Sequence, residues 1–468
     1  MEETIVLQGE IPSLTKKGFE SGSMAELLSV AYPLIISTAS NTVMQFINRI
    51  FLSRYSADAF AACVPAGILS FTLLCFFMGT TSYTNAFVAQ YHGKGKAASV
   101  SVAVWQGVWL GLISGLVLLA LTPAGRYLID VSGHPAAVKV LEKQYFTILN
   151  AGGVLVTVNT ALAAFFTGRG RTKVTMAANM TGNAVCVLFS WMLIFGRGPA
   201  PELGISGAAY AAVIGQACVL IIYLALIFSS GNRRAYRTAR LVGVHSGLFK
   251  RLIKYGAPNG VGFFLDIASF GVFIFLVGDM DKYSLAANNI IASINMIAFM
   301  PVIGLGLANL TLVGRYIGKK QPDVSVKVTR NAVKLALLYV VSIGFLFFVF
   351  PGVFVDIFGS PDSSEFLPIL AASRPLMKVL TFYICFDAVA IIFADALRGA
   401  GDTRFQMIVG SLLAWLLFVP GIYYLVNYAH ASLMSVWVWA LVYVTLLALV
   451  FGRRFNAGGW RAINILKG

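Results

Sequence analysis

The sequence predicts an all-α membrane protein with twelve transmembrane helices in two pseudo-symmetric six-helix bundles. The first reason is composition: the 468 residues are 58% hydrophobic and only 12% charged, with a mean hydropathy of +0.81. The second is that apolar runs of about 20 residues or more recur along the chain, and a helix of that length crosses a bilayer core. These runs are continuous and do not alternate with period two, which excludes a membrane β-barrel.

The boundaries of the twelve spans are set by charged residues and by Gly and Pro clusters. In chain order, the predicted helices cover residues 27–50, 60–88, 99–122, 144–167, 174–196, 205–229, 252–278, 284–313, 333–357, 371–396, 405–427 and 433–452. The segment before Met24 carries several charges, which indicates a short soluble tail and no cleavable signal peptide.

The distribution of basic residues predicts the orientation. If both termini are cytoplasmic, 26 of the 35 Lys and Arg residues lie on the cytoplasmic side and nine on the other. This bias favours a multi-pass protein of the cell inner membrane with both ends inside. The net charge of +16 is thereby explained by basic loops, and no nucleic-acid partner is expected.

The two halves of the chain resemble each other, which is the third observation. Three pairs of segments match at nearly constant offsets and at equivalent places among the spans: "FTGRGRTK" (166–173) with "LRGAGDTR" (397–404), "FVAQYHGKGK" (87–96) with "LVGRYIGKKQ" (312–321), and Pro33 with Pro258. We call the difference in numbering between Pro33 and Pro258, which the second pair shares, the repeat offset. With six spans each, both halves enter the membrane from the same side. This parallel repeat is typical of secondary transporters that rock one half against the other.

The repeat divides the chain into five parts. We predict a cytoplasmic tail (1–24), an N-lobe (25–230), a basic linker (231–251), a C-lobe (252–455) and a C-terminal tail (456–468). The Gly-rich segments 168–170 and 399–401 are interpreted as tight turns, because no phosphate-binding G-x-x-x-x-G-K-[ST] motif occurs. Transport energy is therefore expected from an ion gradient, without a cofactor.

Two acids are predicted deep inside the membrane. Asp266 lies twelve positions after Lys254, which places it about 18 Å along a helix. Asp387 is also central in its span, whereas Asp395 lies near the end and is expected to pair with Arg398. A charge at the bilayer centre costs about 2.5–3.5 kcal/mol, so the two central acids need protons or a shared cation. Such a pair suits coupling to H⁺ or Na⁺, although an interhelical hydrogen bond is the simpler alternative.

The sequence resembles the multidrug and toxic compound extrusion (MATE) family over almost its whole length. The resemblance is carried by "FFTGRGRTKVTM" (165–176), "WMLIFGRGPAPELGISGAAYAAVIGQ" (191–216), "YGAPNGVGFFLD" (255–266) and "FDAVAIIFADALRGAGDT" (386–403). It implies two six-helix lobes and the export of substrates, often organic cations, in exchange for Na⁺ or H⁺. The NorM-type branch carries acids in helices 7 and 10, which here are Asp266 and Asp387.

The sequence differs from the family pattern in the first lobe. Another branch of the family relies on acids there, but this chain has Asn48 and Ser190 at those positions. A cation site in the second lobe is thus favoured. Its predicted ligands are oxygen atoms, which suit a hard cation such as Na⁺. They are Asp266, Asp387, Tyr383 one helical turn before Asp387, and Asn288.

Polar residues also form one face of the first helix: Ser37, Asn41, Gln45 and Asn48. They either line a cavity for substrate or bind a neighbouring helix, and the spacing fits both. Phe264 and Asn289 are further candidates for cavity lining. We expect a monomer in the lipid bilayer that exports a small organic molecule and is not an enzyme. A flippase for lipid-linked precursors is the alternative, but it would need more charge in its cavity.

Overall fold

The computed structural model describes residues 19–240, 242–358 and 366–466. Within these residues twelve helical spans are long and apolar enough to cross a membrane, as the sequence predicted. The first half consists of α1 (Met24–Tyr55), α2 (Ala57–Ser82), α3 (Thr84–Gly93), α4 (Ala97–Asp130), α5 (Ala136–Thr167), α6 (Thr172–Phe195), α7 (Gly204–Ile227) and the short α8 (Ser230–Tyr236).

The second half repeats this order with more interruptions. It consists of α9 (Ser246–Gly278), α10 (Lys282–Gly318), α11 (Pro322–Val349), α12 (Pro351–Val355), η1 (Asp356–Phe358), α13 (Leu367–Ala400), α14 (Thr403–Leu412), the π-helical η2 (Leu413–Phe418), α15 (Val419–Asn427), α16 (Leu433–Asn456) and η3 (Gly459–Ala462). Together α14, η2 and α15 make one span, as α2 and α3 do in the first half.

The predicted span 333–357 was placed wrongly. The helix runs over Pro322–Val349, and a separate short helix begins at Pro351. Proline at position 351 cannot donate the backbone hydrogen bond that would continue α11. The start was missed because the first turns of α11 are polar and extend beyond the apolar run. For the same reason α5 begins at Ala136, two turns before its predicted start.

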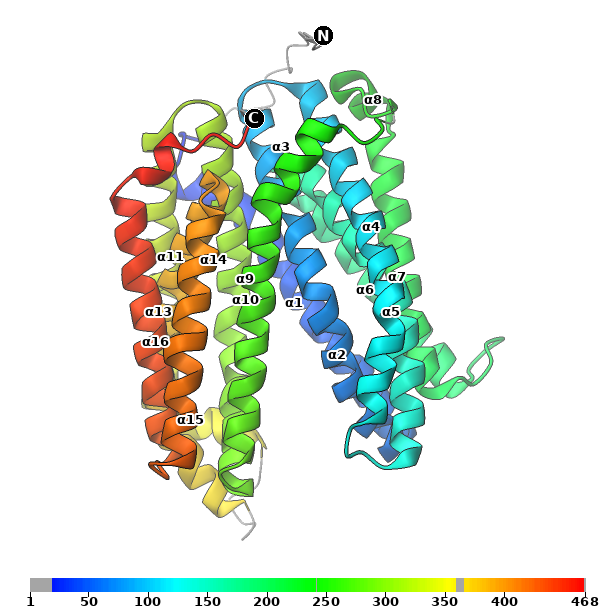
Figure 1. Ribbon diagram of the computed structural model, residues 1–468, viewed down its shortest axis with the longest axis vertical. Coiled ribbons are helices and arrows are strands. Elements are labelled where there is room, and N and C mark those ends of the chain that lie inside the picture. Colours follow the sequence, from blue (N-terminus) through cyan, green and yellow to red (C-terminus); the bar gives the residue numbers. More distant parts are fainter. Residues whose placement is uncertain (1–18, 241, 359–365, 467–468) are drawn as a thin grey trace.

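The helices form two bundles, seen side by side in Figure 1. One contains α1–α7 and the other α9–α16, and they lie close together at the end where α3 lies and spread apart toward the opposite end. The main contacts between the bundles join α1 to α10, α2 to α9 and α3 to α10. We call this contact region the seam. The pairing of helices supports the predicted division into an N-lobe and a C-lobe, whose boundaries remain a prediction.

The two copies of the repeat contact each other at the seam in a reciprocal way. A Cβ atom on Gly93 of α3 would collide with the carbonyl oxygen of Arg315, and one on Gly318 of α10 would collide with that of Gln90. The two glycines are related by the repeat offset, and so are their two partners. The contact is therefore nearly self-complementary, as in a two-fold symmetric dimer, and only glycine permits the close approach of the two backbones.

Both described ends of the chain lie at the seam. Near the start, the Glu26 carboxylate accepts a hydrogen bond of 2.6 Å from the Tyr316 hydroxyl, and Arg315 lies 3.4 Å from its other oxygen. Near the end, Ile465 is fully buried in an apolar cluster that includes Tyr83 and Phe87 of the first half. Residues 1–18 and 467–468 of the predicted tails, and residue 241 of the predicted linker, lie outside the described residues.

Candidate cation and substrate site

The two central acids lie on α9 and α13, in the bundle formed by the second half. Asp266 is exposed and Asp387 is half-buried, and both sit near the middle of their spans. The Ser269 hydroxyl, one turn later on α9, donates to the backbone carbonyl of Asp266 at 2.9 Å and not to its carboxylate. An exposed carboxylate at this depth needs water or a cation beside it, because lipid would leave it unsolvated.

The acids lie near each other and near two tyrosines. The charge of Asp266 acts on Asp387, and both charges act on the Tyr443 hydroxyl of α16. Asp387 also acts on Tyr383, one turn earlier on α13. Two carboxylates and two phenolic oxygens from three helices thus gather in one region, and all four are ligand types that a hard cation prefers.

Asn288, predicted as a cation ligand, has its side-chain oxygen bound to a residue of α16. It is fully buried, and its Oδ1 accepts a hydrogen bond of 3.2 Å from the indole nitrogen of Trp437. The Trp437 ring in turn contacts the Tyr383 ring, with 5.7 Å between centroids. Asn288 therefore supports the ring that positions Tyr383. Asp387 also lines a small pocket together with Asn295 of α10.

The polar face of the first helix is bound mainly to α6. Asn179 Nδ2 donates to the Ser37 hydroxyl at 2.8 Å, and Asn183 Nδ2 donates to Asn41 Oδ1 at 2.8 Å and to the Ser40 hydroxyl at 3.0 Å. For Ser37 and Asn41 these bonds support helix–helix hydrogen bonding, one of the two alternatives that the sequence left open. Gln45 is exposed on α1 and stays a prediction for cavity lining.

Neutral residues occupy the two first-lobe positions at which another branch of the family carries acids. Asn48 Nδ2 contacts Met44 Sδ at 3.3 Å and Cys186 Sγ at 3.6 Å, which are weak acceptors. Ser190 is fully buried in α6. Among the described residues, neither Asn48 Oδ1 nor Ser190 Oγ has a hydrogen-bond partner.

Phe264 and Asn289, the other two residues predicted to line a cavity, lie on α9 and α10. Phe264 is half-buried and lies two positions before Asp266, so it lies on nearly the opposite face of α9. Asn289 is exposed on α10, about 100° around the helix from buried Asn288. Tyr443 is not predicted from the sequence, because tyrosine in a span is usually an interfacial anchor and nothing in "WALVYVTLL" distinguishes this one.

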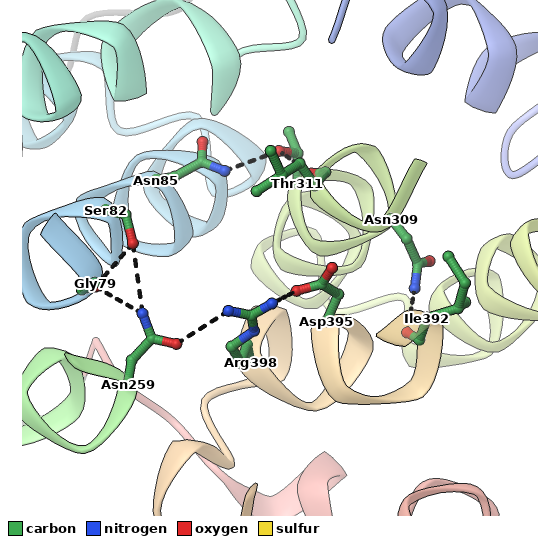
Figure 2. A network of polar contacts seen from close by, with 10 residues as sticks. Gly79, Ser82, Asn85, Asn259, Asn309, Thr311, Ile392, Asp395 and Arg398 are labelled. Carbon is green, nitrogen blue, oxygen red and sulfur yellow. Dashed lines mark hydrogen bonds and ion pairs between the residues drawn. The ribbon is translucent and has the colours of Figure 1, made fainter. Parts of the chain in front are cut away.

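A network of polar contacts crosses the seam (Figure 2). The Asp395–Arg398 pair, which the sequence predicted, forms between the two side chains. Arg398 Nη1 donates to Asn259 Oδ1 of α9 at 3.3 Å, and Asn259 Nδ2 donates to the Gly79 carbonyl of α2 at 2.6 Å. Asn85 of α3 donates to the Thr311 hydroxyl of α10 at 2.9 Å. Buried hydrogen bonds therefore join the bundles at this end.

A comparison with protein families settles the class of the molecule. The family model described as MatE matches residues 33–192 and again residues 258–424. The chain belongs to the MatE family. The two matches begin at Pro33 and Pro258, the pair that defines the repeat offset, so the MatE unit occurs once in each half.

Relatives and solved structures agree with this placement. The chain is 25% identical over 466 residues to the "Probable multidrug resistance protein NorM" of Thermotoga maritima, covering 98% of this chain and 95% of that protein. It is 25% identical over 405 residues to the "Multidrug resistance protein PmpM" of Pseudomonas aeruginosa, covering 85% and 83%. A structure described as the "Outward-facing conformation of a multidrug resistance MATE family transporter of the MOP superfamily" superposes with a TM-score of 0.84 at 17% identity, covering 96% and 100%.

A second structural neighbour shares the fold. A "MOP superfamily transporter" of Pyrococcus furiosus, for which "reverse polarity of binding pocket suggests different function", superposes with a TM-score of 0.83 at 16% identity, covering 96% and 100%. The MatE family consists of membrane transporters, so the predictions of a multi-pass transporter fold and of a protein that is not an enzyme are confirmed.

Proposed function

We propose that the protein is an antiporter that exports organic, often cationic, compounds across the cell inner membrane in exchange for Na⁺ or H⁺. The main support for this proposal is that four oxygen-bearing side chains lie near one another at mid-span in the second bundle: Asp266, Asp387, Tyr383 and Tyr443. The names of the Thermotoga and Pseudomonas relatives support drug-like molecules as cargo. The coupling cation is a transported substrate, taken up and released in each cycle.

The proposed exchange follows from charge. When the cation leaves, two carboxylates remain close together inside the span, and this arrangement favours the return of a positive charge. A cationic cargo or a new coupling ion can supply it. Competition between the two for the same negative region makes exchange possible without simultaneous binding. Asn288 contributes by holding Trp437 against Tyr383.

We place both termini in the cytoplasm, which makes the seam the closed cytoplasmic side. The bias of Lys and Arg toward that side supports this orientation. The spreading of the bundles at the opposite end in Figure 1 then corresponds to an outward-facing state, and closure there with opening of the seam completes alternating access. One chain holds both copies of the repeat, which supports function as a monomer.

The test is efflux of ethidium, a fluorescent organic cation, from proteoliposomes under an imposed Na⁺ gradient and, separately, a pH gradient. The wild-type protein should move ethidium under one of them. Asp266→Asn and Asp387→Asn should stop this movement while thermal stability and monodispersity are retained. Asn41→Ala, a change in the other bundle, is the control that should transport. Normal efflux by both aspartate variants would overturn the proposal.

A further inference from the structure

The Arg398 side chain occupies an unusual place between the acid pair and the seam. It is on the last turns of α13, and it binds Asp395 on its own helix and Asn259 on α9 at the same time. Asp395 is buried, and its second oxygen lies beside Gly306. This packing leaves the Asp395 carboxylate little room to move to another partner. Arg398 Nε is buried and has no acceptor among the residues that the structure describes. One donor is therefore uncommitted.

Through Asn259 the guanidinium is linked to a contact between the bundles. The Asn259 oxygen accepts from Arg398, and the Asn259 nitrogen donates to the Gly79 carbonyl and, at 3.4 Å, to the Ser82 hydroxyl of α2. The backbone of the same turn is bound as well: the Tyr83 hydroxyl donates to the Arg398 carbonyl at 3.0 Å, and Gln90 Nε2 donates to that of Gly399 at 3.1 Å. Arg398 thus lies at the point where α13, α9 and the α2–α3 junction meet.

The same residue is electrostatically connected to the acids. Asp266 lies seven positions after Asn259, two turns along the same face of α9, or about 10.5 Å. The positive charge of Arg398 acts on Asp266. Within a protein, charges are screened far less than in water, so placing a cation at Asp266 raises the energy of the half-buried Arg398 guanidinium.

We propose that Arg398 is a coupling residue that conveys occupancy of the acid pair to the seam. With the acids empty, their negative charge stabilises the half-buried guanidinium, and the bond to Asn259 keeps α9 against α2. Binding of a cation removes that stabilisation and weakens the bond, so the seam opens. The inference rests on the proposed cation site, and Arg398 is here a positioning residue that does not touch the cation or the cargo.

The experiment measures the width of the seam directly. Spin labels at Lys96→Cys and Lys320→Cys, two exposed positions on opposite sides of the seam, report the distance by pulsed electron paramagnetic resonance. The five native cysteines are first replaced by alanine. In the wild type, the cation that drives efflux in the experiment above should shift the distribution to longer distances. Arg398→Gln should be open about tenfold more often without cation, as loss of a charged hydrogen bond implies, and should no longer respond.

Two further variants keep this test decisive. Arg454→Gln breaks the Arg454–Asp402 ion pair (2.8 Å), which lies within the second bundle, and it should respond like the wild type. Arg398→Lys keeps the charge and should keep part of the response even if Arg398→Gln folds poorly. A response in Arg398→Gln equal to the wild type, or a wild-type seam that ignores the driving cation, overturns the inference. Unimpaired efflux by Asp266→Asn and Asp387→Asn instead overturns the proposed function, whatever the seam does.

Discussion

The two bundles share one frame but use the same helix position for different chemistry. The repeat offset that relates Pro33 to Pro258 also relates Asn41 on α1 to Asp266 on α9. Asn41 is bound by Asn183 of its own bundle, whereas Asp266 interacts electrostatically with a second carboxylate and a tyrosine. The duplication therefore preserved the backbone contacts and let the buried polar groups diverge. One bundle holds a helix–helix tie where the other holds charge.

The largest effect is expected from moving the acid between the bundles. Asp266→Asn should lose cation-driven ethidium efflux, and adding Asn41→Asp should not restore it, because the first bundle lacks a partner equivalent to Asp387. Alignment of "FTGRGRTK" with "LRGAGDTR" places Val156 at that position. Efflux from proteoliposomes measures this. Restored efflux in the double variant would show that the two bundles are interchangeable and would break the comparison.

The seam should respond equally to changes in either bundle. Gly93→Ala and Gly318→Ala each place a Cβ against a backbone carbonyl of the other helix, which cannot rotate away. Overpacking of this kind costs about 1–3 kcal/mol, so each variant should favour the open seam to a similar extent. The spin-label distance across the seam reports the shift. Gly271→Ala, whose Cβ would meet open space, is the matched control and should leave the distance unchanged.

The tie between α1 and α6 should matter for stability and little for transport. Asn183→Ala removes the hydrogen bonds to Ser40 and Asn41. In membrane proteins such bonds contribute about 0.6 kcal/mol on average and up to about 1.7. Denaturant unfolding in detergent should show a loss in this range, with efflux retained. A complete loss of efflux in a well-folded variant would mean that the polar face of α1 serves substrate after all.

The smallest effect distinguishes two equivalent helix caps. Ser56 caps α2 and Asp281 caps α10, again related by the repeat offset. Asp281 Oδ1 accepts from the backbone nitrogens of Tyr283 at 2.8 Å and Ser284 at 2.9 Å. Hydrogen bonding from the Ser284 hydroxyl and these amides lowers the pKa of Asp281. The Asp281 contribution is therefore complete above the unfolded pKa of about 3.9 and is lost as the pH falls through the lower folded value.

This difference can be measured by melting the variants at two pH values. At pH 7, Ser56→Ala and Asp281→Ala should each cost about 0.5–1 kcal/mol, since the caps are solvent-accessible. Near pH 2 the penalty of Asp281→Ala should shrink while that of Ser56→Ala persists. Equal pH dependence of the two variants would contradict the assignment of a charged cap to the second bundle alone.

Much of the fold could be predicted because its signals are local. Span length, basic loops and the repeated Gly-rich turns fix the number and order of helices, and an acid in an apolar run identifies Asp266 and Asp387. Contacts between helices are not local. The direction of the α1 polar face, the contribution of Tyr443 and the link from Arg398 through Asn259 to α2 depend on how the bundles meet. Span 333–357 was misplaced because polar first turns hide a helix start.

The most direct measurement follows the coupling ion itself. Uptake of ²²Na⁺, and of H⁺ by a trapped pH indicator, is recorded in proteoliposomes while ethidium leaves them. One of the two ions should enter as ethidium exits in the wild type and in Asn41→Ala, and neither flux should occur in Asp266→Asn or Asp387→Asn. Ethidium efflux by the wild type with no movement of either ion would contradict a cation exchanged at the acids of the second bundle.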